Sequence, residues 1–142
     1  MEEKKYILDM KKILLLAAIS AATASCISCQ ESLEERAARE AREFTEKNCP
    51  VRISEAIVSD SLTFEPSTKT LHYYMSVNGN ADTTAIAQQT DIRKNMISSL
   101  KGTTSVRPYK EAGYNFKYTY RSTKHPGKIL LELTITKADY NN

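Results

Sequence analysis

The order of helical and strand patterns in the sequence predicts an α+β fold. Two segments place apolar residues at helical spacing, and the other patterned segments alternate apolar and polar residues as strands do. They run in the order αββαββ. Antiparallel hairpins with one apolar face need a cover, and each helix offers one apolar face. We therefore predict a four-stranded antiparallel sheet with both helices packed on one face, after an N-terminal signal peptide.

The first helix is expected over Gln30–Lys47. Ser32 and Glu35 have the spacing of a capping box, in which each side chain binds the other residue's backbone amide. Pro50 follows soon after and cannot continue a helix. The positions that share the apolar face are Leu33, Ala37, Ala41 and Phe44.

Two strands follow, joined by a turn at Pro66-Ser67. Val51–Asp60 and Ser61–Phe64 are interpreted as one long or bent strand, and Thr70–Val77 as the next. The second strand alternates strictly: one face carries Leu71, Tyr73, Met75 and Val77, and the other carries His72, Tyr74 and Ser76.

The second half of the sequence repeats this order. A helix is expected over Thr83–Leu100, capped by Asp82 or Thr83, with Gly102 in the left-handed position after its end. The last two strands are expected at Tyr114–Tyr120 and Ile129–Lys137, around a turn at His125-Pro126-Gly127.

This arrangement leaves one face of the sheet without a helix. The face is polar and aromatic, which suits a solvated surface or contact with a partner. The residues predicted to form this candidate partner-binding face are His72, Tyr74, Lys117, Thr119 and Arg121, with Thr134 and Thr136 beside them.

The N-terminal segment Met10–Cys29 is typical of a secretion signal. Lys11 and Lys12 precede an apolar core of roughly a dozen residues, too short for a membrane-spanning helix of about 20. We expect Met10 to be the true first residue, since Met1–Asp9 carries both signs of charge and is unusual for a signal peptide. We assign residues 1–25 to a signal peptide, 26–31 to a tether and 32–142 to a single α+β domain.

Two processing sites compete at the end of this segment. Thr23-Ala24-Ser25-Cys26 resembles a lipobox in the looser form of Bacteroidetes lipoproteins, and it predicts lipidation of Cys26, with Cys29 as the alternative. The first reading anchors the protein in the bacterial cell envelope, at the outer membrane on its periplasmic or surface side. Cleavage after Ala24 by ordinary signal peptidase would instead release a soluble periplasmic or secreted protein.

The cysteine spacing has a second interpretation. Cys26 and Cys29 form a C-x-x-C, but they end a signal peptide, and no second pair follows to complete a zinc site. We therefore predict neither redox nor metal function. In an oxidising compartment Cys29 and Cys49 could form a disulfide, and free thiols remain the alternative.

The sequence has few features that would indicate a catalytic or ligand-binding site. Its net charge is +3, with both signs interspersed and no basic stripe, which argues against nucleic-acid binding. It has no phosphate-binding glycine motif and no nucleophile elbow. Asp60, Ser61 and His72 could form a triad only on paper, because a strand bend explains the adjacent Asp60 and Ser61. We predict no catalytic, cofactor-binding or metal-ligating residues.

The stretch from Cys49 to Tyr74 resembles small secreted bacterial lipoproteins of uncharacterised function. The matching residues are Cys49-Pro50, Asp60-Ser61 and Tyr73-Tyr74, with Gly113 ahead of a later strand. The resemblance could extend from Lys47 to the C-terminus. It implies an αββαββ lipoprotein-like domain and assigns no catalytic residues.

These observations favour a lipid-anchored binding or structural module of the cell envelope. Its partners would be the membrane, through the lipid anchor, and an envelope protein. The alternative is a small envelope enzyme or an inhibitor of an envelope or secreted enzyme. The first is favoured because no activated nucleophile, metal set or carboxylate pair stands out.

Overall fold

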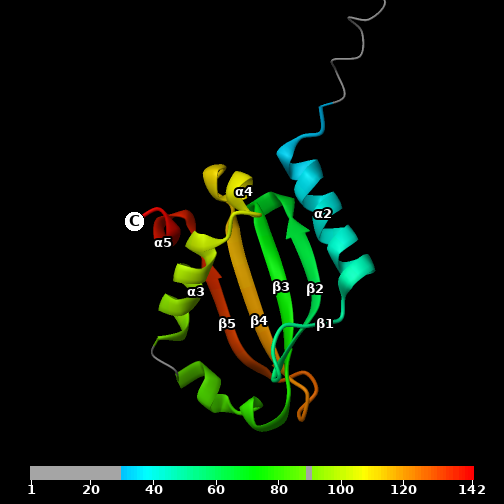
Figure 1. Ribbon diagram of the computed structural model, residues 1–142, viewed down its shortest axis with the longest axis vertical. Helices are drawn as coiled ribbons and strands as arrows, with labels where there is room; N and C mark the ends of the chain where they lie inside the picture. Colours follow the sequence, from blue (N-terminus) through cyan, green and yellow to red (C-terminus); the bar gives the residue numbers. More distant parts are fainter. Residues whose placement is uncertain (1–29, 89–90) are drawn as a thin grey trace, which may run out of the picture. The chain divides into compact units, whose positions relative to one another are not determined.

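The sheet has five strands in the order β1-β2-β3-β4-β5, and it is mixed (Figure 1). The computed structural model describes residues 30–88 and 91–142, and Ser32–Asn142 form one compact unit. The strands are β1 Val51–Arg52, β2 Ile57–Glu65, β3 Thr70–Val77, β4 Asn115–Ser122 and β5 Ile129–Ile135.

The helices lie over two margins of this sheet. In Figure 1, α2 stands beside β2, while α3 and α5 stand beside β5. The α-helices are α2 Leu33–Asn48, α3 Ile92–Gly102, α4 Arg107–Glu111 and α5 Lys137–Tyr140. Short 3-10 turns lie at η2 Pro66–Thr68, η3 Gly79–Ala81 and η4 Thr84–Gln88.

The general α+β class is confirmed, but the all-antiparallel sheet is wrong. β3 and β4 pair in parallel, from Thr70 opposite Asn115 to Val77 opposite Ser122. A parallel pair needs a crossover connection rather than a hairpin, and residues 78–114 supply it. The other neighbouring strands are antiparallel.

The expected long strand from Val51 is also wrong, because it folds into a hairpin. The Ile53 amide donates to the Ile57 carbonyl at 2.9 Å, and the Ile57 amide donates to the Ser54 hydroxyl at 3.2 Å. This turn separates β1 from β2 and adds the fifth strand. Local side-chain bonding of Ser54 competes here with continued extension of the strand.

The capping box at the start of α2 is confirmed, although the helix begins at Leu33 and not at Gln30. The Ser32 amide donates to the Glu35 carboxylate at 2.8 Å, and the Glu35 amide donates to the Ser32 hydroxyl at 3.1 Å. The buried positions are Ala37 and Ala41. Because these side chains are small, α2 can approach β2 closely.

The second helix differs from its prediction. Thr83–Leu100 is replaced by η4 and then α3, which begins only at Ile92. Asp82 caps neither η4 nor α3: it is buried, and its carboxylate accepts from the amides of Thr123 and Lys124 at 2.9 and 2.7 Å. Thr83, the other predicted cap, precedes η4, and its hydroxyl accepts from the Ala85 amide at 3.3 Å.

The glycine prediction at the end of this helix is also wrong. Gly102 is the last residue of α3, and Gly113 is the glycine that turns the chain into β4, with φ of +75°. The strand expected over Ile129–Lys137 ends at Ile135, since Thr136 and Asp139 form a capping box that opens α5.

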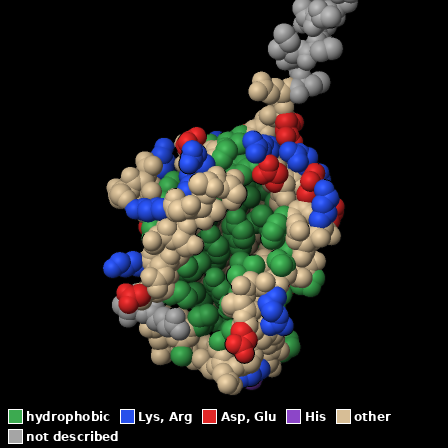
Figure 2. Space-filling view, in the orientation of Figure 1, with side chains coloured by type: hydrophobic (Ala, Val, Ile, Leu, Met, Phe, Trp, Pro, Cys, Tyr) green, Lys and Arg blue, Asp and Glu red, His purple; other side chains and the backbone are tan. Residues whose placement is uncertain are grey.

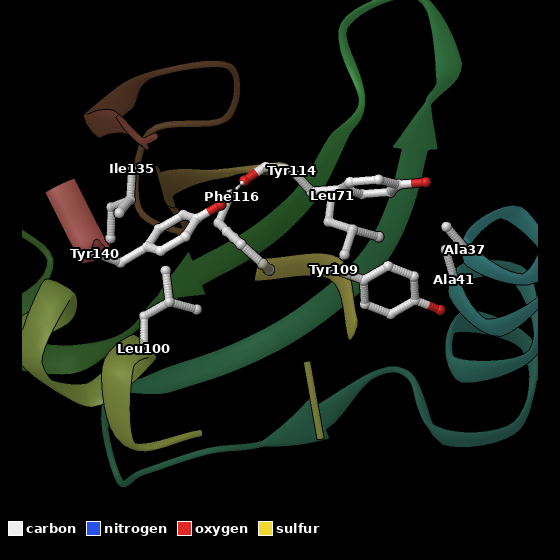
Figure 3. Packing of buried hydrophobic residues seen from close by; sticks show 9 residues of the cluster. All are labelled: Ala37, Ala41, Leu71, Leu100, Tyr109, Tyr114, Phe116, Ile135 and Tyr140. Carbon is white, nitrogen blue, oxygen red and sulfur yellow. Dashed lines mark hydrogen bonds between the residues drawn. The ribbon is translucent and has the colours of Figure 1, made fainter. Parts of the chain in front are cut away.

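The core lies between the sheet and the helices. Figure 3 shows Leu71 and Tyr109 pointing towards Ala37 and Ala41 of α2. The same cluster continues under α3 and α5 with Leu100, Phe116, Ile135 and Tyr140. The predicted strand alternation is confirmed, because the odd-numbered apolar residues of β3 face this core.

Candidate functional site

An open apolar hollow separates α2 from α3 and α4. Figure 2 shows hydrophobic side chains filling the space between these helices. The strand residues that form the floor, Leu62, Leu71 and Tyr73, belong to β2 and β3, and the hollow has a volume of about 340 Å³. We call this hollow the apolar trough; it is lined by Ala37, Ala41, Phe44, Leu62, Leu71, Tyr73, Val106 and Tyr109.

The trough exists because the helices cover only the margins of the sheet. α2 packs chiefly on β2, and η4 lies along β5, so the central strands have no helix directly above them. Tyr73 and Tyr118, which face the helices, therefore remain only half-buried. A sheet that buries one face normally covers its central strands, so this gap is a candidate binding surface.

Tyr73 lines the floor of the trough, and Tyr118 lies beside it. Tyr73 of β3 and Tyr118 of β4 occupy paired positions, and their rings stack with centroids 5.0 Å apart and planes 11° apart. Burial raises the pKa of Tyr73 to about 12, and burial also raises the pKa of Tyr118. Both hydroxyls are therefore protonated at neutral pH.

A hydrogen bond fixes the upper end of the trough. The Tyr109 hydroxyl of α4 donates to the Glu40 carboxylate of α2 at 2.6 Å. Burial would raise the pKa of Glu40, but hydrogen bonds from Tyr109 and Arg36 outweigh it and lower the pKa. The carboxylate thus stays ionised and ties the two walls together.

A second hollow of about 370 Å³ continues at the lower end of the same sheet face. Its apolar lining comes from the sheet and from η4 and α3. These residues are Ile57, Ala85, Ile86, Ile92, Met96 and Tyr120. Figure 2 shows hydrophobic side chains along the space between the two ends.

The two walls differ in charge. The wall at residues 91–111 is basic, with Arg93, Lys94, Lys101, Arg107 and Lys110 against Asp91 and Glu111. On α2 five acidic residues stand against four basic ones, and several form pairs, for example Arg36 with Glu40 at 2.7 Å. The basic residues of the 91–111 segment do not line the trough: Lys101, Arg107 and Lys110 line a separate hollow with Tyr140 and Asn141.

Lys110 positions the basic wall. Its ammonium donates to the carbonyls of Leu100, Lys101 and Thr103 at 2.7–2.9 Å. These carbonyls end α3, where a cation is favoured by the helix dipole. The contact holds α4 against α3 and so fixes the wall of the trough.

The opposite face of the sheet gathers the predicted partner-face residues. The His72 ring and the Thr119 hydroxyl lie 2.8 Å apart, and the Thr119 hydroxyl donates to the Glu132 carboxylate at 2.8 Å. Tyr74 stacks on His72 with centroids 4.0 Å apart, and Arg121 lies over the Tyr74 ring. Lys117 pairs with Glu132 at 3.0 Å. All five predicted residues thus share one network, to which Glu132 is an unpredicted addition.

The charge state of this network follows from its geometry. Since the Thr119 proton goes to Glu132, the His72 Nε2 atom donates to Thr119. Burial, with Lys117 and Arg121 nearby, lowers the pKa of His72 against the opposing effect of Glu132. His72 is therefore neutral at pH 7, and its bonds are made within the sheet.

The hypothetical catalytic triad of Asp60, Ser61 and His72 does not form. The Asp60 carboxylate accepts from the Ser76 hydroxyl at 2.5 Å, and Ser61 makes no hydrogen bond to His72 among residues 30–88 and 91–142. In that same part of the chain, no group of three or more His, Cys, Asp or Glu could hold a metal ion.

The cysteine predictions fall mostly outside the described residues. Cys26 and Cys29 lie there, so lipidation and the Cys29–Cys49 disulfide remain predictions. Cys49 is half-buried and follows the last turn of α2. In the part of the chain that is described, every helix is too short or too polar to cross a bilayer.

Sequence reasoning missed the apolar trough. In the structure Tyr114, just before β4, is fully buried, whereas Tyr118 and Tyr120 of β4 are only half-buried. The available signal was the set of tyrosines on the helix-facing side of β3 and β4, which are Tyr73, Tyr118 and Tyr120 and are too many for two short helices to cover.

The fold is shared with secreted and secretion-system proteins. A candidate secreted protein of Pseudomonas aeruginosa superposes with a TM-score of 0.60 at 16% identity, over 78% of this chain and 99% of that one. The type 2 secretion system pilotin EpsS of Vibrio vulnificus gives 0.59 at 16% identity, over 76% and 91%.

A third structure is the type II secretion system pilotin AspS of Vibrio cholerae. It gives a TM-score of 0.52 at 18% identity, over 75% of this chain and 91% of that one. These identities establish a common fold. No curated protein matches the sequence. The model of one family matches residues 32–131, and the chain therefore belongs to the family described as Domain of unknown function (DUF8479).

Proposed function

We propose that the chain is a lipid-anchored module of the bacterial cell envelope whose apolar trough binds one amphipathic helix of an envelope protein. The observation that carries this proposal is the uncovered centre of the sheet between α2 and α4. Type II secretion system pilotins of two Vibrio species share this fold, and the signal-like N-terminus supports an envelope location.

The shape of the trough suits a helix. The floor follows β3, whose eight residues span about 26 Å at roughly 3.3 Å each. A helix of about 17 residues has the same length at 1.5 Å per residue. Laid between α2 and α3, it would complete a helical layer over the sheet.

The chemistry of the trough defines the helix it would take. The apolar floor selects an apolar stripe at positions i, i+3, i+4 and i+7.

Two exposed neighbours provide a matched test of trough binding. Ser105 lines the trough, whereas the adjacent Thr104 is exposed and does not line it. We expect Ser105→Arg to block binding and Thr104→Arg to leave it unchanged. Both substitutions are at the surface, so the fold should tolerate each.

Photo-crosslinking in cells supplies the ligand for this test. A benzophenone amino acid at Val106 in the trough should react with one amphipathic segment of one envelope protein, and the same probe at Lys117 on the open face should not. The segment, made as a synthetic peptide, should bind the full chain at least about tenfold more weakly after Ser105→Arg. Equal binding to both Arg variants would overturn the proposal.

The lipid anchor has its own test. Palmitate labelling should mark the wild type and not Cys26→Ala. Equal labelling of the variant would move the anchor to Cys29. Absence of label in both would favour cleavage after Ala24.

A further inference from the structure

The tyrosine hydroxyls of this fold differ in their partners. Tyr109 of α4 donates to Glu40, and Tyr140 of α5 donates to the Tyr114 carbonyl at 2.9 Å. The Tyr114 hydroxyl is buried without a partner in the described part of the chain. The hydroxyls of Tyr73, which lines the trough, and of Tyr118, which stacks on Tyr73, also make no hydrogen bond among residues 30–88 and 91–142.

We infer that the hydroxyls of Tyr73 and Tyr118 select a helix that carries one uncharged polar side chain, Asn, Gln, Ser or Thr, within its apolar stripe. The inference rests on the proposed function and deepens it. It specifies which amphipathic helices the trough accepts and which it rejects.

The physical reason is the loss of water on binding. A helix laid over the floor displaces the water from both hydroxyls, and a wholly apolar stripe would leave two buried donors without acceptors. The two rings stack and come from paired positions on one face of the sheet, so a helix laid over that face would meet both side chains. One amide or hydroxyl oxygen placed between them can accept from both.

An uncharged acceptor is better than a carboxylate at this position. Burying a carboxylate beside two neutral tyrosines would cost its full hydration, with no cation on the floor to compensate. The basic residues of the 91–111 segment are not among those that line the trough.

This selection has a use in the cell envelope. Signal sequences and membrane-spanning helices are common there and present wholly apolar faces. A site that hydrogen-bonds its ligand rejects analogues that lack the polar group far more strongly than an apolar pocket rejects a change of size. The tyrosine pair would therefore exclude such helices from the trough.

The test uses the full chain and a displayed library of helical peptides about 18 residues long, a length matched to β3. Each peptide has a fixed amphipathic pattern, with all twenty amino acids allowed at the central stripe positions. We expect selected peptides to carry Asn, Gln, Ser or Thr at one of these positions. Replacing that residue by Leu should weaken binding to the wild type about tenfold.

A double-mutant cycle identifies the hydroxyls as the cause. In Tyr73→Phe/Tyr118→Phe the same Leu replacement should cost nothing, while Tyr74→Phe on the open face should behave as wild type. Thermal unfolding verifies that each variant is folded. Selected peptides with wholly apolar stripes, or an equal effect of Leu in the wild type and the double variant, would overturn the inference.

The proposed function fails in a different way. Peptides that bind equally to Ser105→Arg and Thr104→Arg do not occupy the trough, and a selection that yields no binding peptide overturns both proposals. Peptides that are blocked by Ser105→Arg but lack the polar residue overturn only the role of the tyrosine pair.

Discussion

Thr45 of α2 bonds to Leu62 of β2 as a neighbouring strand would. Its hydroxyl donates to the Leu62 carbonyl at 2.8 Å and accepts from the Leu62 amide at 2.9 Å. β1 pairs only with the first part of β2. The single side chain of Thr45 therefore closes part of an edge that would otherwise expose backbone groups, and it holds α2 as the wall of the apolar trough.

Thr45→Val should destabilise the fold by about 1–3 kcal/mol, because it keeps the shape of the side chain but removes both bonds to the Leu62 backbone. Chemical denaturation measures the change in the free energy of unfolding. Thr63→Val is the control, since Thr63 is an exposed threonine of β2, next to Leu62. Equal effects of the two substitutions would show that the Thr45 bonds add no stability.

Asp82 should make the free energy of unfolding depend on pH in the acidic range. Burial opposes its ionisation, but hydrogen bonds from Ser122, Lys124 and Thr123 outweigh burial and lower its pKa from 3.8 to about 2. Because the folded-state pKa is depressed, this contribution is present above the unfolded pKa and is lost as the pH falls from about 4 to 2.

Asp82→Asn tests this link directly. The variant should be less stable than the wild type near neutral pH, and the difference should shrink below about pH 4. Asp91→Asn is the control, because Asp91 is exposed and its side chain makes no capping hydrogen bond. A difference between wild type and Asp82→Asn that stays constant with pH would contradict the prediction.

Tyr109→Phe should weaken the link between the two walls of the trough. The hydroxyl donates to an ionised carboxylate, a type of bond that contributes about 1.5–3 kcal/mol. We expect a loss of that order in the free energy of unfolding. In a cycle with Glu40→Gln, most of the loss should appear as coupling between the two residues. Additive effects would mean that the contact contributes little.

Tyr114 and Tyr140 should respond oppositely to removal of the hydroxyl. Tyr114 is fully buried, and its hydroxyl has no partner among the described residues. Tyr114→Phe should therefore be neutral or stabilising. Tyr140→Phe loses bonds to the carbonyls of Tyr114 and Lys110 and should cost about 1 kcal/mol. Thermal unfolding of the pair gives the comparison; a destabilised Tyr114→Phe would mean that its hydroxyl is bonded in solution.

Local patterns were predictable where neighbours in sequence supply the interaction. The Ser32–Glu35 capping box and the alternation of Thr70–Val77 are of this kind, because each depends on spacings of two or three residues. The Ser54 turn and the short α5 also have local causes, and sequence reasoning missed both. In each case a serine or threonine interrupts a pattern that favours a strand.

The position of Asp82 could not be predicted in this way. Asp82 directly precedes a segment with a helical pattern, and its carboxylate can accept hydrogen bonds from the first amides of a helix. This position favoured a capping role. In the structure it binds amides at Thr123 and Lys124, on the far side of the crossover. A long-range contact of this kind depends on which strands become neighbours, and no local spacing encodes it.

The sequence by itself determined the α+β class and the faces of β3 and β4, since these follow from periodicity. The envelope signal lies outside the described residues and stays a prediction. Only the tertiary structure decided that β3 and β4 are parallel, and that α2 and α3 lie at the margins of the sheet. Alternation assigns Tyr73 and Tyr118 to the helical face, but it does not say whether a helix covers them. That depends on where each helix packs, and this placement is what leaves the apolar trough open.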